Sequence, residues 1–311
     1  MKKPAFAFAA LVAASTMALA SCGSADAGGS APAGGSSDVS LGLALSTLNN
    51  PFFVSVRDGA QAAAKKAGVK LTVTDARDDA TQQADQVLNF QTQELDGVII
   101  NPVDSDAAGP IVSPLLAAKT PVVAVDRAVN GATVSSFVSS DNVKGGSLAA
   151  DALAKAIGEK GEVIVLQGVA GTSASRERGK GFAEGIAAYP NIKVVATQPA
   201  NFDRAKGLDV ATNLLQANPD AVGIFAENDE MALGAVQALG AKAGKDVFVV
   251  GFDGTDDGVA AIKAGTMTAS IAQQPDELGK KAVETALALI DGKKADATIS
   301  VPVVVVTKDS K

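Results

Sequence analysis

Side chains that carry much of protein chemistry are absent or nearly absent from this sequence. Its 311 residues contain no histidine, no tryptophan and a single cysteine, Cys22. Zinc sites built from histidine and paired cysteines, disulfide frameworks and histidine-activated nucleophiles are therefore excluded. An enzyme would have to work with carboxylates, lysine, serine or tyrosine. The composition favours a binding protein that uses no metal and no other cofactor.

The sequence also has no excess of positive charge. Lysine and arginine number 27 against 34 acidic residues, which gives a net charge of -7 at pH 7. Because nucleic-acid binders neutralise phosphates with basic side chains, this balance argues against DNA or RNA as a partner. Hydrophobic residues make up 47% of the chain, so there is ample material for packed cores. The length suits about two domains.

The N-terminal 38 residues have the pattern of an export signal followed by a tether. Two lysines precede an uncharged and mostly apolar segment, residues 5–19, which is shorter than the roughly 20 apolar residues of a membrane-spanning helix. The sequence Leu-Ala-Ser-Cys22 resembles the bacterial lipobox, in which the cysteine is lipidated and becomes the N-terminus. Residues 22–38, rich in glycine, serine and alanine, are typical of a flexible coil. We expect a signal peptide over residues 1–21 and a lipid on Cys22 that anchors the protein at the outer face of the cell membrane or in the periplasm. A simple signal peptide cut near Ala20 is the alternative.

From Val39 onward, short apolar runs alternate with helical stretches. The runs are continuous rather than alternately apolar and polar, as in strands of a parallel sheet that is covered on both faces. One helix is expected over residues 54–67, ended by Gly68. This alternation predicts an α/β fold built from βαβ units. The predicted strands are Leu41–Leu45, Val69–Val73, Val98–Ile100, Val122–Val125, Val163–Leu166, Val194–Ala196, Ala221–Phe225 and Val247–Val250.

The same arrangement occurs twice along the chain. Asn101 follows one predicted strand and Asp126 follows the next, 25 positions later, and Asn228 and Asp253 repeat this spacing. The repeat predicts two similar Rossmann-like lobes with parallel sheets. Open α/β sheets bind ligands at the carboxyl ends of their strands, so two such edges facing each other would form a cleft.

Further polar residues gather just after the predicted strands. Each alone could be an ordinary helix cap or turn residue. Two acidic and two arginine side chains balance in charge, which suits a neutral ligand with many hydroxyls better than a phosphorylated one. Paired with arginines, the two carboxylates should stay ionised well below pH 6. The residues are Asn50, Asn101, Asp126, Arg127, Arg178, Asn228, Asp253 and Gln273.

Four phenylalanines are expected at strand-to-helix junctions rather than inside strands. They are Phe52, Phe53, Phe202 and Phe252. The usual place of phenylalanine is a core. Rings against the C–H faces of a sugar, with polar groups around its rim, would explain this combination of residues.

Six motifs carry a more specific signal. They are Ser46-Thr-Leu-Asn-Asn-Pro-Phe-Phe53, Ile100-Asn-Pro-Val-Asp-Ser-Asp106, Gly171-Thr-Ser-Ala-Ser-Arg-Glu-Arg-Gly179, Gln198-Pro-Ala-Asn-Phe-Asp203, Glu227-Asn-Asp-Glu-Met-Ala-Leu-Gly234 and Val250-Gly-Phe-Asp-Gly-Thr255. In this order they resemble the ribose-binding proteins of bacterial sugar ABC transporters, over essentially all of residues 39–311.

The resemblance implies a periplasmic-binding-protein-like fold of type I with three crossovers between its lobes. It implies one lobe of residues 39–140 plus 274–302 and another of residues 141–273 plus 303–311. It also implies a monomeric receptor rather than an enzyme. This receptor would bind a monosaccharide, with D-ribose as the first candidate, and present it to a membrane permease driven by an ATPase. The implied sugar contacts are Asn50, Phe52, Phe53, Asn101, Asp126, Arg127, Arg178, Phe202, Asn228, Phe252, Asp253 and Gln273, with Ser46 at the rim.

Three alternatives stay open at this point. An enzyme could use Asp126 or Asp253 as a general base, but no activated nucleophile or metal set accompanies them in the sequence. A sugar-responsive repressor would need a helix-turn-helix where the signal peptide stands. Allose, xylose, galactose or a furanose could replace ribose. Glu227 departs from the resemblance, because the family often has an amide there, and an inward carboxylate would disturb the neutral balance.

Overall fold

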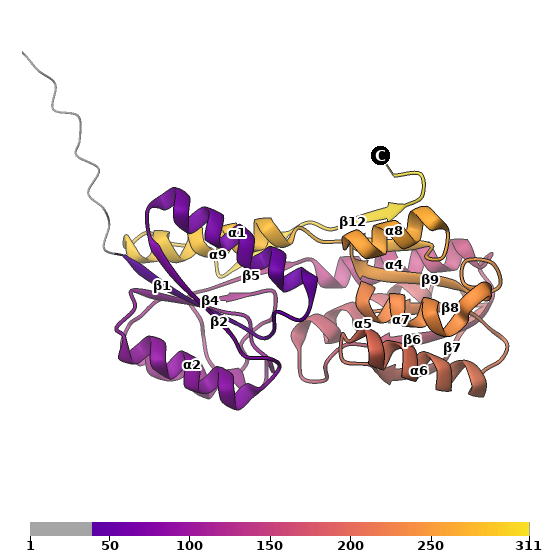
Figure 1. The fold of residues 1–311 in the computed structure, drawn as a ribbon, viewed down its shortest axis with the longest axis horizontal. Coiled ribbons are helices and arrows are strands. Elements are labelled where there is room, and N and C mark those ends of the chain that lie inside the picture. The colour runs from indigo at the N-terminus through magenta and orange to yellow at the C-terminus, as the bar shows by residue number, and fades with distance from the viewer. Residues whose placement is uncertain (1–38, 311) are drawn as a thin grey trace, which may run out of the picture. The chain divides into compact units, whose positions relative to one another are not determined.

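A computed structural model describes residues 39–310, which form two α/β lobes (Figure 1). The expected signal peptide, tether and lipid on Cys22 lie outside the described residues. Lobe 1 contains a sheet with the strand order β11-β5-β4-β3-β1-β2, and lobe 2 contains a sheet with the order β12-β10-β9-β8-β6-β7. Among the described residues, strand pairing is parallel everywhere except between β10 and β12. The predicted pair of lobes with parallel sheets is therefore confirmed.

The elements of each lobe come from separate parts of the chain. The strands are β1 (Ser40–Leu45), β2 (Lys70–Asp75), β3 (Gly97–Ile100), β4 (Val122–Val125), β5 (Ser136–Ser140), β6 (Gly161–Gln167), β7 (Ile192–Pro199), β8 (Ala221–Ala226), β9 (Phe248–Asp253), β10 (Ala269–Ala272), β11 (Thr298–Val301) and β12 (Val304–Thr307). The helices are α1 (Pro51–Ala67), α2 (Ala80–Thr92), α3 (Ala108–Ala117), α4 (Asn142–Ala156), α5 (Ser173–Ile186), α6 (Arg204–Ala217), α7 (Asp229–Leu239), α8 (Asp256–Ala264) and α9 (Pro275–Ile290), with a 3-10 turn, η1 (Gly240–Lys242).

Helix α1 shows how the local sequence sets an element next to the later site. The side chain of Asn50 accepts the backbone N–H of Phe52 at 2.9 Å and so caps the helix start. Pro51 occupies the first turn, where its missing N–H costs nothing. The helix therefore begins three residues before the expected position. It ends as predicted at Gly68, whose φ of 72° is the left-handed conformation of a C-cap.

Helices cover both faces of each sheet. In lobe 1, α1 and α9 lie side by side on one face, indigo beside yellow in Figure 1, and α2 and α3 pack together on the other. In lobe 2, α4 and α5 cover one face, and α6 and α7 cover the other. Strands β3 and β4 are buried along their whole length, which explains their continuous apolar runs.

The chain passes between the sheets three times. It leaves lobe 1 after β5, returns after β10 to form α9 and β11, and leaves again between Val301 and Val304 to add β12 to lobe 2. The lobe limits given above, 39–140 plus 274–302 and 141–273 plus 303–311, remain our proposal for the domain division.

Strands β5, β10, β11 and β12 are additional to the eight predicted runs. Strand β5 was missed because its sequence, Ser136-Phe-Val-Ser-Ser140, is rich in serine. Its first serine is buried, and the hydroxyl donates to the carbonyl of Asp296 at 2.7 Å. A satisfied hydroxyl of this kind can take the place of an apolar side chain in a buried strand.

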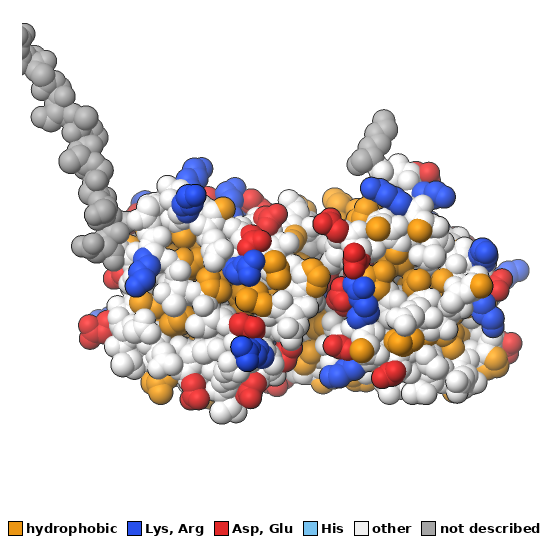
Figure 2. Space-filling model, viewed as in Figure 1, with side chains coloured by type: hydrophobic (Ala, Val, Ile, Leu, Met, Phe, Trp, Pro, Cys, Tyr) orange, Lys and Arg blue, Asp and Glu red, His pale blue; other side chains and the backbone are white. Residues whose placement is uncertain are grey.

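Surface charge is mixed over both lobes. On the face seen in Figure 2, basic and acidic side chains of the described residues are interspersed rather than gathered by sign.

No helix within residues 39–310 has the length and apolar character needed to cross a membrane.

Candidate functional site

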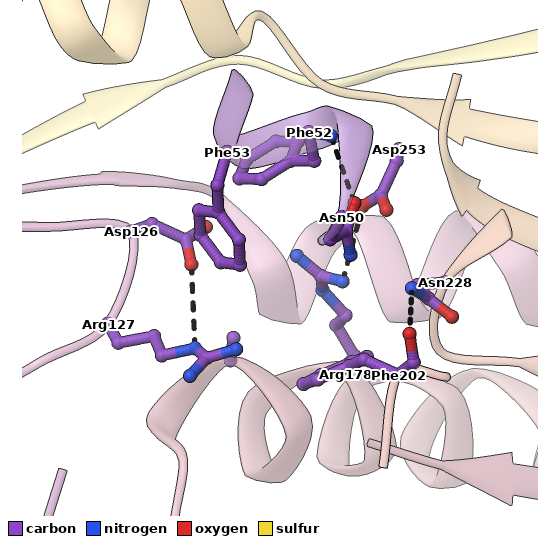
Figure 3. A pocket seen from close by; sticks show the side chains of 10 residues that line it. Asn50, Phe52, Phe53, Asp126, Arg127, Arg178, Phe202, Asn228 and Asp253 are labelled. Atoms are coloured by element: carbon purple, nitrogen blue, oxygen red, sulfur yellow. Dashed lines mark hydrogen bonds and ion pairs between the residues drawn. The ribbon is translucent and has the colours of Figure 1, made fainter. Parts of the chain in front are cut away.

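A cavity lies between the two lobes, and each lobe provides half of its lining. Its free volume is about 10 Å³, room for about one water molecule, so the lining side chains of the two lobes approach one another closely. Figure 3 shows the side chains that converge on it. Lobe 1 contributes Asn50, Phe52, Phe53, Asp126 and Arg127, and lobe 2 contributes Ala174, Arg178, Phe202, Asn228 and Asp253.

An acidic and a basic side chain from lobe 1 adjoin in the cavity. Asp126 directly follows β4, and its Oδ2 lies 3.8 Å from Nε of Arg127. Both side chains are 3% exposed. The Arg127 guanidinium also donates Nη1 to the carbonyl of Pro102 at 3.0 Å. Asp126 Oδ1 and Arg127 Nε have no hydrogen-bond partner among the described residues, so both are available to a ligand that donates and accepts.

Lobe 2 presents the second pair. Nη1 of Arg178, on α5, lies 3.5 Å from Oδ1 of Asp253, at the end of β9. The same Nη1 donates to the carbonyl of Glu227 at 2.7 Å, and Nε donates to Oδ1 of Asn142 at 2.9 Å. Gln273 donates its amide to Asp253 Oδ1 at 2.7 Å. The guanidinium is therefore held in one orientation, as bidentate recognition of neighbouring oxygens requires.

Aromatic rings from both lobes lie against the arginines. The guanidinium carbon of Arg127 is 5.2 Å from the ring centre of Phe53 and 5.6 Å from that of Phe202. Phe52 packs edge-on against Phe53, with ring centres 5.1 Å apart. The cavity thus combines apolar ring faces with charged groups, an arrangement suited to a molecule that has both C–H faces and hydroxyl rims.

The expectation that Phe252 lies at a strand-to-helix junction is wrong. Phe252 lies inside β9, is fully buried in the lobe 2 core, and is not among the cavity-lining residues. Its ring instead supports Arg178, whose guanidinium carbon lies 3.9 Å from the ring centre. Gly145 of α4 packs so closely on the ring that a Cβ there would collide with it. Phe252 acts on the cavity through Arg178.

The three remaining polar candidates from the sequence have mainly structural contacts. Asn101 is fully buried, accepts the Ser46 hydroxyl at 2.6 Å and donates to Asp126 Oδ2 at 3.4 Å. Asn228 lines the cavity, but its side chain caps α7 at Met231. Gln273 and Asn101 lie behind residues that line the cavity and are hydrogen-bonded to them. The placement of Ser46 at the rim is wrong, because that residue is 0% exposed.

Three residues that line the cavity have a strained backbone. Asp126, Phe202 and Asp253 have φ values of 63°, 59° and 116°, a region that residues other than glycine rarely adopt. Strain of this kind persists only where surrounding contacts enforce it, and it is common at functional sites. It turns the three side chains toward the space between the lobes.

Burial controls the protonation of the two cavity carboxylates. It raises the pKa of Asp126 above its ordinary value, and the nearby Arg178 and Arg127 only partly offset this. Burial likewise raises the pKa of Asp253 well above its ordinary value, against the opposing effect of Arg178. Burial therefore opposes the ion pairing from which ionised carboxylates below pH 6 were expected.

Two residues of the site were not identified from the sequence. Asn142 fixes the Arg178 guanidinium, and Ala174 lines the cavity one turn before that arginine on α5. Asn142 lies two positions after the end of β5, close to where Asn101 lies after β3, so the signal that found the other candidates would have applied once that serine-rich strand was recognised. Among the described residues no group of acidic side chains could hold a metal ion.

Two α/β lobes with a charged and aromatic cavity between them define a ligand-binding protein of the two-lobe class. The family model described as "Periplasmic binding protein domain" matches residues 41–294, and the chain belongs to this family. The family consists of solute-binding proteins rather than enzymes, as expected from the sequence.

Several relatives are similar over nearly the whole chain. The ribose import binding protein of Escherichia coli (strain K12) is 48% identical over 269 residues, 86% of this chain and 90% of that protein. The ribose import binding protein of Bacillus subtilis (strain 168) is 46% identical, covering 85% and 86%. An ABC transporter periplasmic solute binding protein from Actinobacillus succinogenes 130z, solved with bound D-allose, aligns with a TM-score of 0.82 at 36% identity, covering 87% and 98%. A Caulobacter protein solved with myo-inositol gives a TM-score of 0.83 at 34% identity, covering 90% and 96%.

Proposed function

We propose that this protein is the extracytoplasmic sugar receptor of an ABC importer and that its ligand is D-ribose. The observation that carries the proposal is the cavity, in which each lobe contributes one carboxylate, one arginine and at least one phenylalanine. The sum of charges is neutral, and buried polar atoms of Asp126 and Arg127 lack partners among the described residues. A monosaccharide has hydroxyls that both donate and accept, and ring faces that pack on aromatic side chains.

The relatives support ribose over other sugars. Proteins named as ribose import binding proteins are 45% to 48% identical to the chain, whereas a D-allose-binding periplasmic protein of Escherichia coli is 34% identical. The alternative is the same fold and role with allose, xylose, galactose or a furanose as the ligand.

The two lobes would close on the sugar, and the closed form would be recognised by the permease and its ATPase. Since both lobes line one cavity, an open form gives the ligand access and a closed form surrounds it. We propose that the receptor acts as a monomer and that a lipid on Cys22 holds it at the membrane.

A panel of pentoses and hexoses, added to the purified protein and followed by thermal shift and titration calorimetry, tests the ligand. D-ribose should raise the melting temperature most and bind with the lowest dissociation constant. Small-angle scattering should show compaction with ribose. If another sugar stabilises and compacts the protein while ribose does not, the receptor role stands and the ligand is reassigned. No binding of any monosaccharide would refute the proposal.

A further inference from the structure

Glu227 is buried beneath the cavity and does not line it. It follows β8 and is 0% exposed. Its Oε2 accepts the backbone N–H of Gly168 at 2.7 Å and also accepts the hydroxyl of Ser175. Gly168 follows β6, and Ser175 belongs to the first turn of α5. One carboxylate oxygen therefore joins the ends of three elements of lobe 2.

These contacts reach two cavity residues. Arg178, one turn after Ser175 on α5, donates to the backbone carbonyl of Glu227 at 2.7 Å. The ring of Phe202 lies directly on Gly168, where any Cβ would collide with ring carbons. Glu227 thus holds the backbone on which the Phe202 ring rests and the helix that carries Arg178.

The second carboxylate oxygen of Glu227 has different surroundings. Glu227 Oε1 has no hydrogen-bond partner among the described residues, and Gly179 of α5 packs against it so closely that a Cβ there would lie 3.0 Å away. The charge that faces Glu227 from α5 is Arg178. Gln167 of β6, whose amide also lies near Gly179, is neutral and adds no charge there. The carboxylate of Asp229, on α7, is bonded instead to β10 and the start of α8.

We propose that Glu227 is a positioning residue of the sugar site and that its ionised carboxylate holds Gly168 and α5 in the geometry that binds sugar. This inference rests on the proposed function. Protonation converts charge-assisted hydrogen bonds at Oε2 into neutral ones, which are roughly half as strong. Burial raises the pKa of Glu227 to about 7. Sugar affinity should therefore fall as the pH drops through neutrality.

Titration calorimetry with D-ribose on the purified protein, compared with Glu227→Gln, tests this. The wild-type dissociation constant should rise about threefold or more from pH 8.5 to pH 6, as expected when charge-assisted bonds become neutral. Glu227→Gln should bind at pH 8.5 as weakly as wild type does at pH 6. Glu184→Gln is the control, because Glu184 is an exposed carboxylate on the same helix, and it should follow wild type.

The difference between the two pH profiles is the readout. Asp126 and Asp253 have raised pKa values, and burial raises the pKa of Asp229 to about 6, but these groups titrate in both proteins. A Glu227→Gln profile that keeps the wild-type slope, or a wild-type profile without a step near pH 7, overturns the inference.

A second measurement separates this inference from the proposed function. Amide hydrogen exchange at Gly168, corrected for its intrinsic pH dependence, needs no sugar. Protection should decrease below about pH 7 in wild type and be pH-independent in Glu227→Gln, since only the ionisable side chain changes its hydrogen bond there. Protection that is the same in both proteins at every pH overturns the positioning role. Absence of sugar binding with the expected exchange pattern refutes the proposed function and leaves the role of Glu227 in the backbone geometry supported.

Discussion

Replacing Arg178 with lysine should be a severe change for the cavity. The arginine side chain is 4% exposed, and its guanidinium contacts Asn142, Glu227 and Asp253 at 2.9, 2.7 and 3.5 Å. Its plane also rests on Phe252. A lysine ammonium is a point charge at the end of a flexible stem, so it cannot reproduce this fork or the stacking.

The size of the affinity loss follows from the hydrogen bonds that the Arg178 guanidinium would make to the sugar. Losing one charge-assisted hydrogen bond costs about 1.5–3 kcal/mol, which corresponds to about 10- to 150-fold in the dissociation constant. Titration calorimetry with D-ribose measures this change, and the melting temperature without sugar confirms that Arg178→Lys is folded. A folded variant that binds within twofold of wild type would refute the role given to Arg178.

The control for this experiment needs care. Arg176 lies on the same helix, but its Nη1 is 3.1 Å from Oδ2 of Asp106 in the other lobe, so its replacement could alter closure. Arg57, on α1, pairs with its neighbour Asp58 within the same helix and does not line the cavity. Arg57→Lys should leave the dissociation constant unchanged.

Three further outcomes are expected. Asp126→Ala and Asp253→Ala remove one carboxylate from each lobe. Each variant should lose most ribose binding in calorimetry and most ribose-induced compaction in scattering. An effect at one position alone would contradict a two-lobe site. Cys22→Ser should move the protein from the membrane to the soluble fraction with unchanged ribose affinity, and membrane retention at the wild-type level would contradict the lipid anchor. Because burial raises the pKa of Glu227 from 4.5 to about 7, the folded protein binds a proton that the unfolded chain has released, so its contribution to stability is lost as the pH rises from about 4.5 to 7. At about 1.4 kcal/mol per pKa unit this is about 3 kcal/mol, and the stability lost between pH 5 and pH 8 in urea unfolding should be smaller in Glu227→Gln than in wild type by most of this amount, because the other buried carboxylates titrate in both proteins.

The fold was largely predictable because its strands are unambiguous. Runs such as Val122–Val125 are buried on both faces, and the cap at Gly68 follows from backbone conformation alone. The gathering of residues after strands was also predictable, since the carboxyl ends of parallel strands meet at one edge.

The depth of a residue behind that edge could not be predicted. Phe252 and Asp253 are adjacent in sequence, yet one belongs to the core and the other lines the cavity, because successive side chains of a strand point to opposite sides. The effect of burial on the carboxylate pKa values could not be predicted for a related reason. The sequence shows that Asp126 has an arginine beside it, whereas the cost of burial depends on the packing of both lobes.

The last two strands have a consequence for how the molecule assembles. Strand β11 is the edge of the lobe 1 sheet and pairs with β5, while β12 is the edge of the lobe 2 sheet and pairs with β10. Near this junction, the Ser136 hydroxyl is bonded to a carbonyl 160 residues later. Contacts between such distant segments form slowly, because a long loop must close first. Both sheets therefore stay incomplete until this late segment is made, and a polypeptide stopped before Thr298 would have β5 and β10 as edge strands of its two sheets.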